Sequence, residues 1–529
     1  MRQRWSIGNT TVKPRREVFR KTPLSLPWQA AYWPWWSDAL GGTGLAVLMG
    51  AGTWAPLAAV PLAVLHARLA SSTGLRSAAA RSFVFALFFF AWFLAWLPQS
   101  LAQTLGVAGG FLTAGVIPAA ALVWTLGLSL VWRVTGSWTL LALPFGWVVM
   151  EWGRTQGPLA FPWGAPGYAL TNSPMAQWAS VGGVSLLTLL VTATASVLAG
   201  SLSSSRRARL PLLGSAGVLW LLGWTWGLGQ LASTPSSPRP SLREALLVQG
   251  NIDPRAKARG RSPAELQTYL SLTASALART AADLVIWPET ASPVSPSDPV
   301  LARAVSTWGV PFITGAPGDV PGEARNSAYG VTAARTERQD KRVLVPFGEV
   351  LPFERPLRSL YTPLLAALGL PGYTSLTAGR LTTLLPLGAA QVGVSICYES
   401  VFPALSAAAV RQGANLLVVI SNDAWFGRGS GAEQHFQMGR IRAIETRRAL
   451  LRAGNDGISA SIDPWGQVMF RAPRGIRGAF AAPYRLWTGR SLYVMWGEWV
   501  TVGSGLTLFL TLSVRLAQNR HRSRPRNPR

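Results

Sequence analysis

Three residues of the sequence have side chains and surroundings that suit acyl-transfer chemistry. The single cysteine, Cys397, follows the apolar run 391–396, Glu289 follows the apolar run 283–287, and Lys341 begins a further run. A cysteine thiolate is a strong nucleophile and its thioester product is reactive, but a nearby base or cation must supply the thiolate. Because a free cysteine is more often a small buried hydrophobic residue, Cys397 needs a partner before its position predicts catalysis.

The composition limits which residue can activate Cys397. Histidine is the usual partner, yet the chain has only three histidines, and only His435 falls in the segment expected to be soluble. The other candidates are Glu289 and Lys341, with Glu349 eight residues after the lysine. Each of these charges alone is more often a solvated surface group, and His435 is expected to orient the structure rather than act as the base. One cysteine and three histidines provide no cluster of metal ligands, so no metal and no cofactor is predicted.

The charge balance indicates a membrane protein. A soluble protein has about 25% charged residues, whereas this chain of 529 residues has 13% charged and 49% hydrophobic residues, with 25 tryptophans. The formal net charge is +27, and the densest basic runs, 2–21 and 515–529, flank apolar stretches. Because lysine and arginine stay on the cytoplasmic side of a membrane, both ends are interpreted as cytoplasmic flanks, and no nucleic-acid partner is predicted.

Eight apolar runs are predicted to be transmembrane helices, for which about 20 residues are needed. They cover residues 38–52, 54–69, 82–98, 108–132, 137–153, 176–200, 209–231 and 491–515. The first two runs are short, but basic residues precede and follow the pair, so an even number of passes must separate them and two helices are preferred to one kinked pass. The uncharged loops near residue 53 and over 99–106 then lie outside, as does the segment after Leu231.

Between the seventh and eighth runs the sequence becomes that of a globular α/β domain, with short strands alternating with helices. Strands are expected at 244–248, 283–287, 311–314, 391–396 and 415–420, and helices at 263–282, 403–413 and 435–446. The predicted organisation is a basic cytoplasmic N-terminus with an interfacial segment (1–37), transmembrane helices one to seven (38–231), a linker (232–242), an extracytoplasmic catalytic domain (243–485), transmembrane helix eight (486–516) and a basic cytoplasmic tail (517–529).

Motifs around these residues occur in a characteristic order. They are Val-Gln-Gly-Asn-Ile (248–252), Trp-Pro-Glu (287–289), Val-Pro-Phe-Gly-Glu (345–349), Cys-Tyr-Glu (397–399), Ser-Asn-Asp-Ala-Trp-Phe-Gly (421–427), Gln-His-Phe-Gln (434–437) and, earlier, Glu-Trp-Gly-Arg (151–154) and Phe-Pro-Trp (161–163). Together they resemble the nitrilase, or carbon–nitrogen hydrolase, superfamily, and over nearly the full length the apolipoprotein N-acyltransferase family. The resemblance implies a multi-pass α-helical membrane domain of eight helices plus a nitrilase-like αββα sandwich.

The resemblance also implies a mechanism and a set of site residues. Cys397 would take an acyl chain from a phospholipid, expected to be phosphatidylethanolamine, and pass it through a thioester to the α-amine of the N-terminal diacylglyceryl-cysteine of an apolipoprotein. Glu289 is the expected general base and Lys341 the expected oxyanion donor. The expected supporting residues are Glu349 for positioning or proton transfer, and Tyr398 and Glu399 for the nucleophile turn, although Glu399 could equally serve only local backbone groups. The expected substrate contacts are Asn422, Trp425, Phe353, Tyr361 and Leu364, and Asp423 is expected to line the same site.

The implied location is the bacterial inner membrane, with the catalytic domain on the periplasmic side, and the implied state is a monomer in contact with membrane lipid. The apolar segment 352–371, interrupted by proline and glycine, is predicted to dip into the outer leaflet as a lid. The alternative is an ordinary amphipathic surface helix, which liposomes would not protect from hydrogen exchange. A membrane-tethered amidase and a non-enzymatic transporter are the competing functions. The lid and the helices favour the acyltransferase, and the scarcity of charge within the spans disfavours the transporter.

Overall fold

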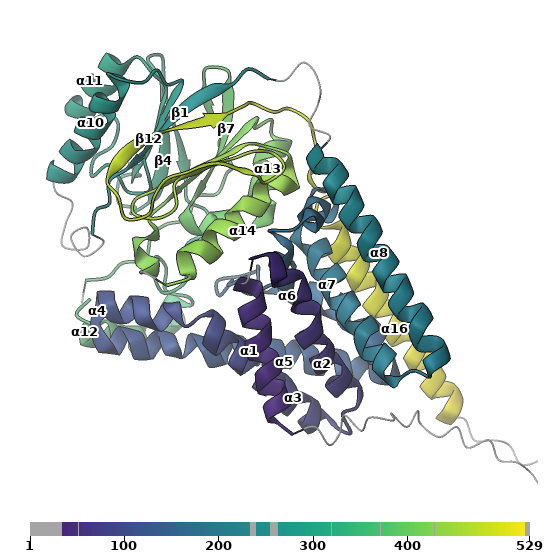
Figure 1. The fold of residues 1–529 in the computed structure, drawn as a ribbon. Coiled ribbons are helices and arrows are strands. Elements are labelled where there is room, and N and C mark those ends of the chain that lie inside the picture. Colours follow the sequence, from purple (N-terminus) through teal and green to yellow (C-terminus); the bar gives the residue numbers. More distant parts are fainter. Residues whose placement is uncertain are drawn as a thin grey trace, which may run out of the picture.

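The computed structural model describes residues 34–50, 52–232, 240–253, 263–318, 320–370, 372–427 and 429–523. It has two parts, a bundle of apolar helices and a domain of two β-sheets flanked by helices, which pack against one another (Figure 1). The predicted basic N-terminal segment lies almost wholly outside the described residues. So do most of the predicted linker, Pro371 in the predicted lid and the end of the basic tail.

The bundle consists of helices that precede the sheet domain and one that follows it. They are α1 (Trp36–Gly50), α2 (Ala59–Ala70), α3 (Leu75–Phe93), α4 (Trp96–Ala114), α5 (Val116–Thr135), α6 (Thr139–Gly153), α7 (Ala179–Ser203), α8 (Arg206–Ala232) and α16 (Trp499–Ser523). Large aromatic rings fill its centre, where Phe89, Phe90, Trp124 and Trp147 are fully buried and pack ring against ring. Leucines and phenylalanines are exposed on the outside, as a surface in contact with lipid requires.

Helix length separates the clear membrane spans from the shorter helices. Within the described ranges, five helical segments are long and apolar enough to cross a membrane: Leu75–Phe93, Gly106–Gly153, Pro174–Leu202, Arg207–Ala232 and Trp499–Gln518. A further apolar segment, Pro56–Ala70, is shorter. These segments support a membrane protein, although they do not reproduce the predicted count of eight spans one for one.

Helix α4 is the main difference from the predicted helices. The sequence predicts a loop over 99–106 and a helix from 108, whereas α4 continues through this region with a break at Gly106 (φ 76°), and α5 begins only at Val116. The loop was predicted because this stretch has no charged residues, which indicates a position outside the membrane but does not exclude a helix. Leucine, alanine and glutamine in the stretch are good helix formers. Figure 1 shows α4 extending sideways from the bundle, beneath the sheets.

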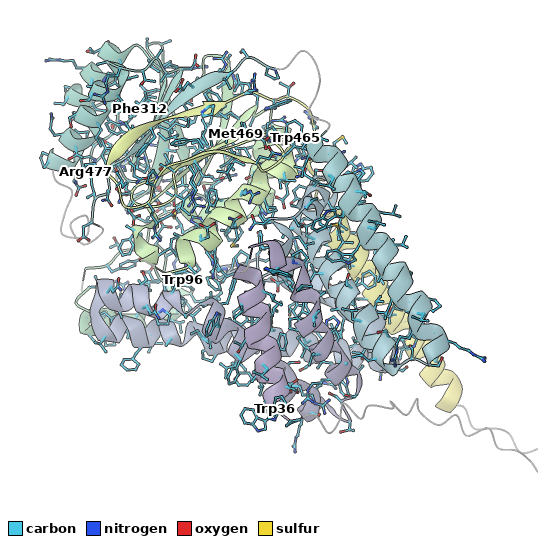
Figure 2. All side chains as sticks on the ribbon, in the orientation of Figure 1. Trp36, Trp96, Phe312, Trp465, Met469 and Arg477 are labelled. Atoms are coloured by element: carbon cyan, nitrogen blue, oxygen red, sulfur yellow. The ribbon has the colours of Figure 1, made fainter. Side chains whose placement is uncertain are left out.

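Polar contacts connect helix ends on the side of the bundle away from the sheets. Arg68 at the end of α2 pairs with Asp38 at the start of α1, with Nε–Oδ1 and Nη2–Oδ2 distances of 2.5 and 2.8 Å. Arg515 in α16 donates to the carbonyl of Arg133 in α5 at 2.6 Å. Figure 2 places Trp36 at this far end, where α16 also ends (Figure 1). The described chain therefore begins and ends on the same side of the bundle.

The sheet domain contains two six-stranded mixed sheets. The first has the order β12-β1-β2-β3-β4-β5 and the second β11-β10-β9-β8-β7-β6. The strands are β1 (Arg243–Gln249), β2 (Leu284–Ile286), β3 (Phe312–Pro317), β4 (Asn326–Val331), β5 (Thr336–Asp340), β6 (Leu385–Leu387), β7 (Ala390–Ile396), β8 (Leu416–Ser421), β9 (Leu450–Gly454), β10 (Ala460–Ile462), β11 (Val468–Arg471) and β12 (Gly478–Tyr484). Strands β1, β2 and β3 are parallel to one another, as are β7, β8 and β9.

The layers follow the predicted αββα arrangement. The two sheets share a core in which Leu247 and Ile286 of the first meet Val392 and Val418 of the second. Helices α10 (Pro263–Leu277) and α11 (Pro299–Trp308) cover the outer face of the first sheet, and α13 (Pro403–Arg411) and α14 (Gly431–Thr446) cover that of the second. The five predicted strands and three predicted helices of this domain are therefore confirmed, while the remaining strands were not predicted.

Helix α14 joins the sheet domain to the bundle through a buried carboxylate. Helix α7 is interrupted at Gly182 and Gly183, where the φ of Gly183 is +68°, and the free N–H of Val184 beyond the break donates to Glu445 Oε1 at 2.9 Å. Glu445 Oε2 is 3.1 Å from Arg442 Nε, and both side chains are fully buried. Burial raises the pKa of Glu445 to about 7, against the opposing effect of Arg442. A residue of the sheet domain thus caps a helix of the bundle.

Replacing Glu445 with alanine should strongly destabilise the protein, because it leaves Arg442 buried without a counter-charge and the α7 break without its acceptor. Loss of one partner of a buried pair typically costs about 3–5 kcal/mol. Glu433→Ala is the matched control on the same helix: Glu433 pairs with Arg471 at 2.6 Å, but both side chains are nearly half exposed, so the expected cost is below about 1 kcal/mol. Thermal unfolding in detergent measures both, and equal shifts would contradict the assigned role of Glu445.

Candidate active site

The predicted triad comes together where strands of both sheets end. Glu289 follows β2 after Trp287 and Pro288, Lys341 directly follows β5, and Cys397 directly follows β7. The first sheet therefore supplies the two charged groups and the second sheet supplies the thiol. Parallel strands whose carboxyl ends meet at one edge are a common place for reactive side chains in α/β proteins.

The charged groups form one buried cluster around the Lys341 ammonium. Lys341 Nζ donates to Glu289 Oε1 at 3.0 Å and to Glu349 Oε1 at 2.8 Å. Asn326 Nδ2 donates to the same two oxygens, at 2.8 and 3.2 Å, and the backbone N–H of Asn422 donates to Glu289 Oε2 at 3.1 Å. The lysine is 1% exposed and Glu289 5%, so water does not satisfy these charges, and the donors and acceptors of the cluster must satisfy one another.

The electrostatics keep Glu289 and Lys341 ionised while Cys397 remains protonated. Burial raises the pKa of Glu289, but the ammonium of Lys341 and hydrogen bonds outweigh it, so the net pKa lies below its ordinary value. Burial lowers the pKa of Lys341, yet Glu289 and Glu349 hold it well above its usual range. Burial and the Glu289 carboxylate raise the pKa of the Cys397 thiol, and Lys341 offsets this only in part. The Cys397 thiol also contributes to the lowered pKa of Glu289, and this carboxylate is therefore the candidate acceptor for the thiol proton.

Cys397 occupies a strained turn whose carbonyl group is hydrogen-bonded by neighbouring side chains. Its φ is +52°, a left-handed conformation that side chains other than glycine rarely adopt. Its carbonyl accepts from Ser400 Oγ at 2.9 Å and lies 3.1 Å from His435 Nε2. Arg452 Nη2 is 2.9 Å from His435 Nδ1. The same Nδ1 lies 3.0 Å from Asp423 Oδ1. Because a carbonyl oxygen only accepts, Nε2 carries a proton toward the Cys397 carbonyl.

Glu399 also fixes this turn through the backbone. It is fully buried, and its carboxylate accepts from the N–H groups of Ile396 at 2.8 Å and Arg342 at 2.7 Å. These bonds tie the nucleophile turn to the segment that follows Lys341. Glu399 thus contacts one backbone group beside Cys397 and one that is distant in the sequence.

Tyr398 and Trp425 face the helical part. The Tyr398 hydroxyl donates to the carbonyl of Ala160 at 2.6 Å, and its ring stacks on Trp163 with centroids 5.9 Å apart. Trp425 is 41% exposed, and its carbonyl accepts from Ser100 of α4. This side of the site therefore lies against the bundle.

The other predicted contact residues divide into two groups. The backbone of Asn422 contacts Glu289, while its side-chain oxygen accepts from Asn455 at 3.0 Å, and Asp423 is buried in an ion pair with Arg452. Both side chains are buried. The group on α12 (Glu354–Ala367) is more exposed: Phe353, just before the helix, is 53% exposed, Leu364 is half-buried, and the Tyr361 hydroxyl is buried and donates to the Pro352 carbonyl.

Sequence reasoning did not identify several residues of the site. Asn326 contacts both carboxylates of the charged cluster, but a single asparagine at the start of a strand gives no sequence signal. Trp163 and Phe426 lie in recognised motifs without having been assigned a role. Their rings, 6.3 Å apart, both lie near His435. Their clustering depends on contacts between the bundle and the sheet domain, which no local pattern encodes.

Comparison with known proteins identifies the family. The model of the apolipoprotein N-acyltransferase N-terminal domain matches residues 41–197, and the carbon–nitrogen hydrolase model matches residues 247–483. The apolipoprotein N-acyltransferase of Gloeobacter violaceus is 34% identical over 443 residues, covering 80% of each chain. That of Bordetella bronchiseptica is 32% identical over 502 residues, covering 84% of this chain and 89% of the relative.

The chain belongs to the apolipoprotein N-acyltransferase family. It is thus an acyltransferase enzyme with a carbon–nitrogen hydrolase domain, as the motifs predicted. Among solved structures, Nit3 of Saccharomyces cerevisiae, in branch 10 of the nitrilase superfamily, has a TM-score of 0.37 and 19% identity over 48% of this chain and 93% of that chain. An amidase from Nesterenkonia sp. has a TM-score of 0.34 and 19% identity over 50% of this chain and 96% of its own.

The thiol chemistry of this N-acyltransferase should show its resting state directly. Because burial and Glu289 raise the pKa of Cys397, the thiolate forms only above the ordinary thiol range, and alkylation by iodoacetamide should still be accelerating at pH 9. Glu289→Gln removes one charge that raises this pKa, so its pH profile should shift toward lower pH. A wild-type profile that reaches its plateau near neutral pH would indicate a preformed thiolate and contradict this account.

Proposed function

We propose that this enzyme transfers an acyl chain from a membrane phospholipid, through a thioester on Cys397, to the α-amine of the N-terminal diacylglyceryl-cysteine of an apolipoprotein. The observation that carries the proposal is the Glu289–Lys341–Cys397 cluster, in which the two charged groups are buried and the thiol is half-buried. Its nucleophile turn contacts the helical bundle through Tyr398. Family membership supports a lipoprotein acceptor. Two parts of the reaction are proposals: phosphatidylethanolamine as the acyl donor, and the thioester on Cys397 as the intermediate.

In the first half-reaction, Glu289 takes the thiol proton as Cys397 sulfur attacks the ester carbonyl carbon. The carbonyl oxygen becomes an oxyanion, and the Lys341 ammonium, together with the backbone N–H after Cys397, stabilises it. The carbon–oxygen bond of the ester then breaks, and Glu289 returns the proton to the leaving alcohol. The products are the Cys397 thioester and a lysophospholipid. Glu349 holds Lys341 from the far side at 2.8 Å, which supports a positioning role for this second carboxylate.

In the second half-reaction, the neutral α-amine of the acceptor attacks the thioester carbonyl. Glu289 takes a proton from the nitrogen as the amide forms, and the departing sulfur recovers a proton from Glu289. One acyl group has then moved from an ester to an amide, and the enzyme is restored. A single carboxylate can serve both halves because its pKa is held low by Lys341 against the effect of burial.

The membrane arrangement that we propose has eight spans, α1, α2, α3, α5, α6, α7, α8 and α16, with α4 at the surface of the bundle rather than across the bilayer. Both ends of the chain would be cytoplasmic and the sheet domain periplasmic, at the inner membrane, in a monomer. Helix α12 would dip into the outer leaflet beside the site. Two observations support this topology. The sequence is basic at both ends, and the described chain begins and ends on the same side of the bundle. The exposed apolar residues Phe353, Leu357 and Leu360 support the place of α12.

Transfer to a defined acceptor tests the proposal. Full-length protein is incubated with phosphatidylethanolamine and a synthetic diacylated lipopeptide, and the peptide mass should rise by one acyl chain. Cys397→Ala should abolish the product. Lys341→Met should lower the rate by at least about 10²-fold, the usual loss for one oxyanion donor. Asp283→Asn is a matched control, because this exposed carboxylate pairs with Arg243 at the end of β2 opposite to Glu289. Full activity of Cys397→Ala, or release of ammonia from small amides without peptide acylation, would contradict the proposal.

A further inference from the structure

Two adjacent residues of α14 contact different parts of the molecule. His435 contacts the nucleophile turn through the Cys397 carbonyl. Gln434, one residue earlier, contacts the helical bundle instead, and no step of the proposed mechanism uses it. Figure 2 shows one of its partners, Trp96, beneath the sheet domain at the junction of the two parts.

The Gln434 side chain forms hydrogen bonds with three separate segments of the bundle. Its Oε1 accepts from the indole N–H of Trp96 at 2.9 Å and of Trp163 at 3.1 Å. Its Nε2 donates to the carbonyl of Phe93 at 2.9 Å, in the last turn of α3. Trp96 begins α4, so a single amide spans the break between α3 and α4 and also holds Trp163. Because an indole N–H can only donate, both rings depend on this acceptor.

Close packing leaves the Trp96 ring little freedom. A Cβ at Gly429 or Gly431 would lie 2.7 or 2.6 Å from Trp96 atoms, so the α14 backbone rests directly on this residue. Trp163 in turn stacks on Tyr398 with an interplanar angle of 9°, and Tyr398 is the residue after Cys397. A continuous set of contacts therefore runs from Gln434 through Trp163 to the nucleophile turn.

We propose that Gln434 is a positioning residue for acyl transfer from lipid. Its amide fixes the Trp96 and Trp163 indoles where the bundle meets the sheet domain and, through the stack of Trp163 on Tyr398, the residue next to Cys397. In this way it sets how an acyl ester that arrives from the membrane is placed at Cys397, without changing the reactivity of the thiol itself. This inference rests on the proposed thioester at Cys397. A merely structural glutamine would instead affect every reaction of Cys397 equally.

The experiment compares two reactions of the same thiol in full-length protein. Single-turnover acylation by phosphatidylethanolamine vesicles reports on lipid positioning, and alkylation by iodoacetamide reports on the thiol. Gln434→Leu should slow acylation about tenfold, because buried indole N–H groups lose their acceptor, and should leave alkylation unchanged. Gln434→Glu keeps an acceptor for both indoles but loses the donor to the Phe93 carbonyl, so it should restore part of the acylation rate. His435→Ala, the adjacent contrast, should change both reactions, since it removes a contact to the Cys397 carbonyl.

A double-mutant comparison makes the test specific to the indole contacts. Trp96→Phe with Trp163→Phe removes both N–H groups and keeps aromatic rings, so adding Gln434→Leu to this pair should slow acylation no further. Equal slowing of acylation and alkylation by Gln434→Leu, no slowing of either, or full additivity with the phenylalanine pair would each overturn the inference. If Gln434→Leu does not yield folded protein, the phenylalanine pair alone must show the selective loss of acylation, and its absence would overturn the inference. Absence of a thioester in the wild-type protein would instead overturn the proposed function on which the inference rests.

Discussion

The Lys341 ammonium, buried between the carboxylates of Glu289 and Glu349, is the interaction on which the rest of the site depends. Three charges in a dry environment are stable only if each is paired and hydrogen-bonded, and Asn326 together with the Asn422 backbone completes the set. This requirement brings the ends of β2, β4, β5 and β8 to one place. It also explains the protonation states, since a carboxylate kept ionised next to a protonated thiol is a base ready for use.

The second constraint is that, in the proposed reaction, this cluster lies beside a membrane. Helix α14 meets that need by contacting both parts of the molecule: Glu445 caps the broken helix α7, Gln434 holds the α3–α4 break, and His435 contacts the Cys397 carbonyl. The nucleophile turn therefore cannot move independently of the bundle. In the proposed reaction this matters because both the donor and the acceptor are membrane-bound.

The sequence predicted what depends on local pattern and on recognisable motifs. Glu289 and Cys397 follow strands whose apolar runs were visible, whereas the polar strand β5 before Lys341 was not predicted. The αββα layers were expected from the apolar runs together with the family resemblance. Asn326 was missed because its role exists only once β4 lies beside β2 and β5. The extent of α4 was missed because the absence of charged residues indicates where a segment lies relative to the membrane, but it does not distinguish a helix from a loop. Trp96 and Gln434 meet across more than 300 residues of chain, a contact that no single-sequence pattern reports.

The central claim is that Cys397 carries the acyl chain, and intact-protein mass spectrometry without any acceptor tests it most directly. After incubation with a phospholipid of defined acyl composition, the protein mass should rise by one acyl group, hydroxylamine should remove it, and peptide mapping should place it on Cys397. An acylated protein that resists hydroxylamine, an adduct on another residue, or acyl transfer to lipopeptide with no enzyme adduct in single-turnover samples would contradict the account.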